Sequence, residues 1–278
     1  MPLDANFHFS QYNLQDYVDC PRRFQLRHLL HLEWPAVQTG PVIEQEKRME
    51  RGTHFHRMVQ QVVNGIPPEA ITKRIIDPIL LDWWTTFLEA DPLGKLSERQ
   101  LTEYTLSASF AGFRILAKYD LLTIEQNRKV TIMDWKTSEH RPKTDWLIQR
   151  VQSRLYPMLL VLGGEGLNES KAWRPNQIEM NYWFVQFPDD AEVIHYNQER
   201  YKRDRQFINA IIEEIITANE ENNFPLTDNP KRCDYCQYRS YCDRGLAAST
   251  LEALDDTEQL EEEEAFKIDF EQIGEIAF

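Results

Sequence analysis

The sequence contains no apolar run near the roughly 20 residues that a helix needs to cross a bilayer. Its first residues, MPLDANFHFSQYN, lack the basic flank and apolar core of a secretory signal. Positive charge is also scarce, with 31 lysines and arginines against 45 acidic residues. The absence of a membrane span and of a secretory signal predicts a cytoplasmic protein without a membrane partner. Because basic residues are outnumbered, the chain as a whole has no general attraction for phosphates.

The excess of negative charge is concentrated at one end of the chain. Of the formal net charge of −14, residues 251–278 contribute −10. We therefore predict a folded domain over residues 1–248 and an acidic tail over 249–278, which we expect to be solvated and largely disordered. The domain is only mildly acidic, so its composition is compatible with a local basic groove.

Cysteine occurs only four times, at Cys20, Cys233, Cys236 and Cys242. Structural disulfides are rare in a reducing compartment. The last three cysteines have the spacing C-x2-C-x5-C, and four thiolates complete either a zinc tetrahedron or a cubane iron–sulfur cluster. A chance C-x-x-C pair beside two buried cysteines is the alternative without a metal. Zinc modules normally take their ligands from one compact segment, whereas Cys20 lies far from the other three, and this separation weighs against zinc.

The order of apolar and polar residues divides the domain into helices and strands. Steps of three and four residues predict helices over 9–30 (two short ones), 43–64, 69–89, 144–162 and 197–220. Residues 99–137 contain no proline and predict a meander of strands. Two more strands are expected over 177–196, separated by a turn at Pro188-Asp189-Asp190. No internal repeat is visible.

The stretch AKYDLLTIEQNRKVTIMDWK, residues 117–136, predicts two strands joined by a turn centred on Asn127. Asp120 and Asp134 are equally distant from that centre, so antiparallel pairing places their Cβ atoms about 5 Å apart. Lys136 projects from the same face as Asp134, because side chains alternate along a strand. Opposed like charges destabilise a hairpin unless they are compensated, usually by a divalent cation. The pattern therefore favours a nuclease-like metal site.

Other candidate site residues flank this hairpin. His56 lies on an apolar helix face one turn after Gly52, and it either fills the core or serves as a third metal ligand. Glu103 on the preceding strand is a weaker candidate for a role outside the ligand sphere or in positioning water. Gln152 and Tyr156 share a face of the following helix, where ordinary polar boundary residues are the alternative reading.

Six motifs occur together in an order that resembles a known family. They are CPRRF, GTHFH, the YD of AKYD, DWK, QSRLY and CDYCQYRSYC. In this combination the chain is similar to RecB-type PD-(D/E)XK nucleases with an iron–sulfur cluster, notably the nuclease domain of AddB-type recombination proteins and the CRISPR-associated 4Fe-4S nucleases. The resemblance covers residues 9–245. It implies an α/β, restriction-endonuclease-like fold with a central mixed sheet flanked by helices.

The resemblance also implies roles for the residues of the hairpin. His56, Asp120 and Asp134 would ligate Mg²⁺ or Mn²⁺ together with the backbone carbonyl of Trp135. Lys136 would orient and polarise the attacking water.

Further implied roles concern DNA and the cysteines. Gln152 and Tyr156 match the Q-x-x-x-Y element of the family, which lies beside the DNA path. Tyr119 stands where the family usually has proline, but only the acid that follows it has a chemical role. A structural [4Fe-4S] cluster joining the N- and C-terminal segments would be held by Cys20, Cys233, Cys236 and Cys242.

The expected function is a metal-dependent DNA nuclease, an exonuclease acting on single-stranded DNA or DNA ends in repair, recombination or CRISPR adaptation. A helicase or CRISPR adaptation proteins are the expected partners. The alternative is an iron–sulfur or zinc DNA-binding subunit that has lost catalysis and scaffolds a helicase. Retention of Asp120, Asp134 and Lys136 argues against that alternative, because an inactive site has no need of all three.

Overall fold

The computed structural model describes residues 3–4, 6–32, 40–94, 99–233 and 236–245. The acidic tail predicted over 249–278 lies outside these described residues. The strands are β1 His8–Ser10, β2 Arg99–Phe110, β3 Phe113–Glu125, β4 Lys129–Lys136, β5 Ile178–Phe184 and β6 Phe187–His195. The longer helices are α1 Gln11–Asp19, α3 Gly40–Val63, α5 Pro78–Ala90, α7 Val151–Gly163 and α8 Gln198–Glu221. The shorter ones are α2 Pro21–Phe24, the π-helical turn η1 Gln25–Leu29, α4 Pro68–Thr72 and α6 Thr144–Gln149.

A mixed sheet of six strands forms the centre of the protein. Strand β3 pairs antiparallel with β2 along one edge, and along the other edge with β1 in parallel and β4 antiparallel. Strand β5 lies parallel to β4, and β6 pairs antiparallel with β5. The parallel pair requires a crossover, which α6 and α7 provide. This arrangement confirms the predicted mixed α/β fold with a central sheet flanked by helices.

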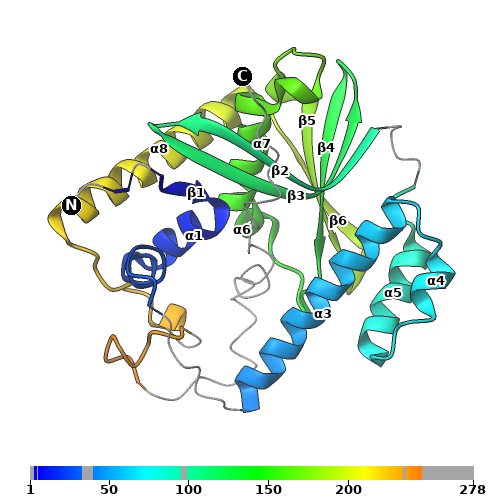
Figure 1. The fold of residues 1–278 in the computed structure, drawn as a ribbon, viewed down its shortest axis with the longest axis horizontal. Coiled ribbons are helices and arrows are strands. Elements are labelled where there is room, and N and C mark those ends of the chain that lie inside the picture. Colours follow the sequence, from blue (N-terminus) through cyan, green and yellow to red (C-terminus); the bar gives the residue numbers. More distant parts are fainter. Residues whose placement is uncertain (1–2, 5, 33–39, 95–98, 234–235, 246–278) are drawn as a thin grey trace.

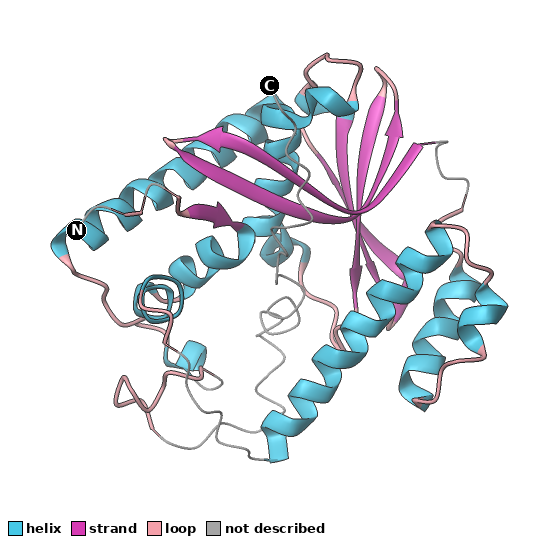
Figure 2. Ribbon diagram, in the orientation of Figure 1, coloured by secondary structure: helices cyan, strands magenta, loops and turns pink. Residues whose placement is uncertain are grey.

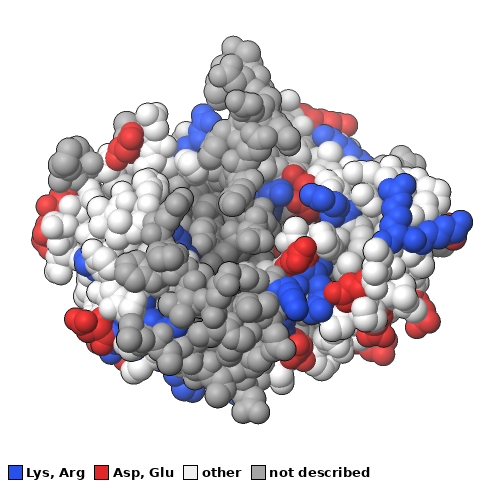
Figure 3. Space-filling view, turned by 60° about the horizontal axis from the view of Figure 1, so that its bottom comes forward, with Lys and Arg blue, Asp and Glu red and all other residues white. Residues whose placement is uncertain are grey.

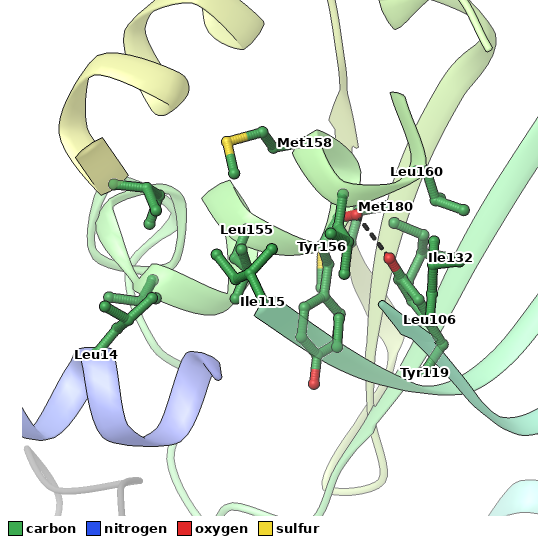
Figure 4. Close-up of a cluster of buried hydrophobic side chains, with 14 of the residues drawn as sticks. Leu14, Leu106, Ile115, Tyr119, Ile132, Leu155, Tyr156, Met158, Leu160 and Met180 are labelled. Atoms are coloured by element: carbon green, nitrogen blue, oxygen red, sulfur yellow. Dashed lines mark hydrogen bonds between the residues drawn. The ribbon is translucent and has the colours of Figure 1, made fainter. Parts of the chain in front are cut away.

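Helices cover both faces of the sheet, as Figures 1 and 2 show. Helices α1, α7 and α8 pack on one face, where Leu155 and Ile115 belong to the larger apolar core. Figure 4 shows part of this core between α1, α7 and the strands. Helices α3 and α5 cover the other face through a second core that includes Phe55 and Trp135. Each face of the sheet is therefore buried against helices.

Local chemistry explains several element boundaries. Ser10 is the N-cap of α1, and its side chain accepts the backbone N–H of Asn13 in a capping box. Asp77 caps α5 directly before Pro78, so the helix predicted over 69–89 is two helices, α4 and α5. The single helix predicted over 144–162 is also wrong. The backbone at Arg150 is extended, and this interruption separates α6 from α7.

One strand was not predicted, and one turn was predicted at the wrong place. Residues 8–10 form the short strand β1, and the first of the two short helices predicted over 9–30 begins directly after it, at Gln11 with Ser10 as its cap. The turn between β5 and β6 falls at residues 185–186, while Pro188 to Asp190 lie inside β6. Because β6 is the last strand of the sheet, a proline there need not remove a ladder hydrogen bond. None of the helices in the described part of the chain is long and apolar enough to cross a membrane.

Candidate active site

The predicted hairpin is confirmed, with β3 and β4 joined at Asn127 in the left-handed conformation (φ 60°). Its ladder runs from Glu125 opposite Lys129 to Leu121 opposite Met133, and the two aspartates follow directly. The side chains of Asp120 and Asp134 point in different directions. Asp120 accepts the backbone N–H of Trp135 at Oδ2, over 3.0 Å, and approaches α3.

Asp120 lies in a group of three metal-ligand side chains. Its Oδ2 is 3.3 Å from Nδ1 of His56 on α3. One ligand atom from each of His56, Glu103 and Asp120 lies within 4.8 Å of the other two. Glu103 also forms an ion pair with Lys118, at 2.6 Å. The structure thus places together two predicted ligands and the residue that the sequence had marked only as a weaker candidate.

An irregularity in β2 and β3 produces this grouping. Glu103 has a φ of 51° in the middle of β2, next to the paired residues Thr102 and Leu121. Along β3, Ala117 and Tyr119 pack into the core under α7, whereas Leu121 packs into the core under α3. The regular alternation of side chains is therefore interrupted at Asp120, which turns its carboxylate toward His56. Local distortions of this kind commonly aim side chains at functional sites.

Helix α3 reaches the hairpin because Gly52 lacks a side chain. A Cβ at this position would lie 3.2 Å from Oγ1 of Thr137, the residue that follows β4. The glycine permits close approach of the helix to the strand end. His56, one turn later, is thereby brought to Asp120, as the sequence had suggested for this helix face.

The three side chains are strongly coupled electrostatically. Burial alone would lower the pKa of His56, but the charge and hydrogen bond of Asp120, aided by Glu103 and Asp134, raise it to about 9. Burial would raise the pKa of Asp120, but protonated His56 and the Trp135 N–H hold it below its ordinary value. In this state His56 is a cation at neutral pH. A metal ion binding there would have to displace its proton.

Asp134 and Lys136 form a second polar group on the other side of the hairpin. Lys136 Nζ lies 3.1 Å from Asp134 Oδ2 and donates to Oε1 of Gln152 over 3.2 Å. Gln152 Nε2 donates to Asp134 Oδ1 over 2.7 Å. All three side chains are buried. Lys136 therefore lies beside Asp134, as predicted, and Gln152 orients both. The role of Asp134 as a metal ligand stays a prediction, because the three-residue group found within the described chain does not contain it.

Tyr156 lies away from the surface, with 3% of its area exposed. Its ring centre is 4.9 Å from that of Tyr119, whose hydroxyl donates to the Tyr156 carbonyl over 2.9 Å (Figure 4). The side chain thus packs in the core beneath the site. Its contact with DNA stays a prediction.

The segments that carry the four cysteines are held together by contacts outside the thiols. Phe24 stacks on Phe224 with 6.3 Å between ring centres, and the Arg22 N–H donates to the Pro225 carbonyl over 3.2 Å. Arg232 lies 3.3 Å from Asp19. The structure therefore joins the two ends of the domain, as the cysteine pattern predicted.

None of these four described cysteines forms a disulfide: Cys20 is buried, and Cys233, Cys236 and Cys242 are partly exposed. Burial raises the pKa of Cys236 to about 11 despite nearby Arg23. Burial and the neighbouring Cys20 also raise the pKa of Cys242. A cluster at this position stays a prediction.

Figure 3 shows one face of the molecule, on which basic and acidic side chains of described residues are intermixed. This face gives no support for a continuous basic groove among the side chains it shows. The groove considered from composition stays a prediction.

Comparison with known proteins identifies the family. A model of the PD-(D/E)XK nuclease superfamily matches residues 8–243. The chain belongs to this superfamily of nucleases. No curated protein sequence matches it. Among solved structures, SSO0001 is similar at 15% identity and a TM-score of 0.42, covering 89% of this chain and 90% of the other. A candidate exonuclease from Eubacterium rectale is similar at 10% identity and a TM-score of 0.49, covering 92% and 94%.

The structure adds residues that the sequence did not single out. Tyr182 on β5 is the register neighbour of Asp134, and its hydroxyl donates to Gln152 Oε1 over 3.3 Å. Ser153 Oγ lies 2.7 Å from that hydroxyl. A parallel pairing between β4 and β5 was not predictable from local pattern, so no signal in the sequence connected Tyr182 with the hairpin.

Proposed function

We propose that this nuclease is a divalent-metal-dependent deoxyribonuclease, in which Mg²⁺ or Mn²⁺ is held by His56, Glu103 and Asp120 with Asp134 nearby. The observation that carries the proposal is the group of ligand atoms within 4.8 Å, placed across the hairpin from the pair of Asp134 and Lys136. Hydrolysis of a phosphodiester requires charge neutralisation at the phosphate and a reacting water that is oriented and deprotonated, and these two groups of residues lie where they could provide both.

The donor atoms fit such an ion. Carboxylate oxygens suit Mg²⁺ and Mn²⁺, and an imidazole nitrogen favours Mn²⁺ over Mg²⁺. Ligand atoms around an octahedral Mg²⁺ are about 3–4 Å apart, slightly closer than the 4.8 Å limit of this group. A small contraction of the group would bring its three ligand atoms to the spacing found around an octahedral ion. The backbone carbonyl of Trp135, next to the N–H bound by Asp120, is a further ligand implied by the family resemblance.

The ion, when bound, supplies charge neutralisation at the scissile phosphate and lowers the pKa of water. The residues of the chain position the groups that act on the water. Lys136 is fixed by Asp134 and Gln152, so its side chain is held in place to orient and polarise the attacking water. Burial of these groups strengthens each electrostatic contact, because water screens it less.

We further propose that Cys20, Cys233, Cys236 and Cys242 hold a structural [4Fe-4S] cluster. The contacts between the terminal segments support a shared site. Thiolates around zinc, bound at about 2.3 Å, lie about 3.8 Å apart. Within the described chain, no three thiols meet the 4.8 Å spacing that the His56 group meets, so their arrangement is looser than a zinc tetrahedron. The larger cubane fits that looser spacing better.

The resemblance of the motifs to RecB-type nucleases supports the finer parts of the proposal. These are action as an exonuclease on single-stranded DNA or DNA ends, and a place in repair, recombination or CRISPR adaptation beside a helicase or CRISPR adaptation proteins in the cytoplasm.

The test uses the full chain with Mn²⁺ and two single-stranded DNA substrates of equal length, one linear and end-labelled, one a closed circle. We expect the linear strand to be shortened progressively and the circle to persist. Asp120→Asn should abolish shortening of the linear strand. Cleavage of the circle at an equal rate would reject the exonuclease assignment. Tight DNA binding without any cleavage would favour the alternative, a binding subunit that has lost catalysis.

A further inference from the structure

A buried hydroxyl pair lies behind the lysine of the candidate site. Tyr182 Oη donates to Gln152 Oε1 over 3.3 Å, and Ser153 Oγ lies 2.7 Å from Tyr182 Oη. Ser153 also contacts the carbonyl of Leu147 in α6. Tyr182 and Ser153 are both buried, so these contacts form in a region of low dielectric. The pair connects β5 to the junction of α6 and α7.

The position of Tyr182 follows from the sheet. It is the register neighbour of Asp134 in the parallel pairing of β4 with β5. The β5–β6 ladder has a register shift between Tyr182 and Phe184, immediately after the tyrosine. Its ring also lies beneath Lys136, with Nζ 5.4 Å from the ring centre. Tyr182 therefore contacts the lysine by its ring and the glutamine by its hydroxyl.

The polarity of the contacts fixes the amide of Gln152 in one orientation. Its oxygen faces two donors, Lys136 Nζ and Tyr182 Oη, and its nitrogen faces the carboxylate of Asp134. A rotated amide would place N–H groups against an ammonium group and an oxygen against a carboxylate. Because Gln152 touches both Asp134 and Lys136, whatever fixes this amide also fixes them.

We propose that Tyr182 and Ser153 are positioning residues that hold Gln152, and through it Lys136 and Asp134, in the arrangement used for phosphodiester hydrolysis. The catalytic part of this inference rests on the proposed nuclease function. The positioning part does not depend on that function, because it concerns only contacts between side chains of this chain. The single hydroxyl proton of Ser153 has two acceptors, the Leu147 carbonyl and Tyr182 Oη. In the arrangement in which Ser153 donates to Tyr182, Tyr182 donates to Gln152, so loss of either hydroxyl loosens the same amide.

Tyr182→Phe isolates the hydroxyl, because the ring beneath Lys136 is kept. A buried hydrogen bond is worth about 1 kcal/mol, which corresponds to about a fivefold change in an equilibrium or a rate. We expect acylation of Lys136 by acetic anhydride, measured by mass spectrometry without DNA or Mn²⁺, to become about fivefold faster. With Mn²⁺ and DNA, kcat should fall by a similar factor while KM changes little.

Three further variants make the test specific. Ser153→Ala should change both readouts in the same direction. Tyr196→Phe removes another buried hydroxyl, at the opposite end of β5 beside Ile178, and should leave both unchanged. In a Gln152→Ala background, Tyr182→Phe should have no further effect, because the connecting amide is gone.

The inference is overturned if Lys136 is acylated equally fast in wild type and Tyr182→Phe. It is overturned equally if Tyr182→Phe has its full effect in the Gln152→Ala background. Absence of DNA cleavage by the wild type would reject the proposed function instead, and the acylation rates would still decide whether the hydroxyl pair positions the lysine.

Discussion

Replacement of Asp16 by asparagine should destabilise the domain more than any exposed charge replacement. Asp16 on α1 is almost fully buried, with 5% of its side chain exposed, and two arginines and a histidine surround it. Arg23 Nε lies at 2.7 Å, Arg27 Nη1 at 3.1 Å and His28 Nε2 at 2.7 Å. Burial alone would raise the pKa of Asp16, but Arg23 and Arg27 hold it well below its ordinary range.

Removal of one partner from a buried ion pair typically costs about 3–5 kcal/mol, because the other charges remain buried without it. Asparagine keeps some polar contacts, so we expect the free energy of unfolding to fall by about 3 kcal/mol. For a domain of this size this corresponds to a fall in Tm of about 6–12 °C. The measurement is urea and thermal unfolding at pH 7.5, followed by circular dichroism.

Asp190→Asn is the matched control. Its ion pair with Arg141 is just as short, at 2.6 Å, but 66% of the Asp190 side chain is exposed. Exposed pairs contribute about 0–1 kcal/mol. If both variants lose the same stability, or if Asp16→Asn loses less than about 1 kcal/mol, burial does not decide the strength of these pairs and the reasoning is refuted.

Three further predictions concern pH, the metal and the cysteines. Burial lowers the pKa of His28 below 6.5, so the folded state binds this proton less readily than the unfolded chain. The contribution of His28 to stability is then full above about pH 6.5 and falls as the pH drops through that value, with a further loss below about pH 4, where the unfolded chain protonates Asp16; His56, with its raised pKa, contributes in the opposite sense between about pH 6.5 and 9, so a urea midpoint that is flat from pH 6.5 to 5 would contradict the His28 prediction. Glu103→Gln should weaken Mn²⁺ binding in calorimetry by at least about tenfold with the fold intact, since one anionic ligand is lost; equal affinity would exclude Glu103 from the site. Cys20→Ser should lose bound iron, the absorbance near ~400 nm and thermal stability; wild-type protein that is colourless and carries equimolar zinc would reject the cluster.

The hairpin was predictable because its signals are local. A polar turn around Asn127 between two apolar runs set the register, and the observed ladder has that register. The same symmetry argument applied to the turn at Ala111 and Gly112 pairs Glu103 with Asp120, so Glu103 could have been found by it. What local pattern could not supply is the irregular backbone at Glu103, which turns Asp120 toward His56.

Other features depend on contacts between distant segments. Strand β1 is three residues long, too short to show a period, and it forms because β3 offers an edge beside it. The break at Arg150 has neither glycine nor proline to mark it, whereas Pro157 lies inside α7 without ending it. Tyr156 shares a helix face with Gln152 in sequence, yet only Gln152 reaches the site.

The most direct test of the account compares wild type with Lys136→Ala on plasmid-length DNA in the presence of Mn²⁺. The structure holds Lys136 beside Asp134 and Gln152, and the proposed function assigns it to the attacking water. Loss of a group that takes part in proton transfer at the reacting water typically lowers the rate by about 10²–10⁴-fold. The account predicts degradation by wild type and a loss of that size in Lys136→Ala, measured at a temperature at which circular dichroism shows both proteins folded, because loss of this buried ion pair also lowers stability. Equal rates of degradation in the two proteins would contradict it.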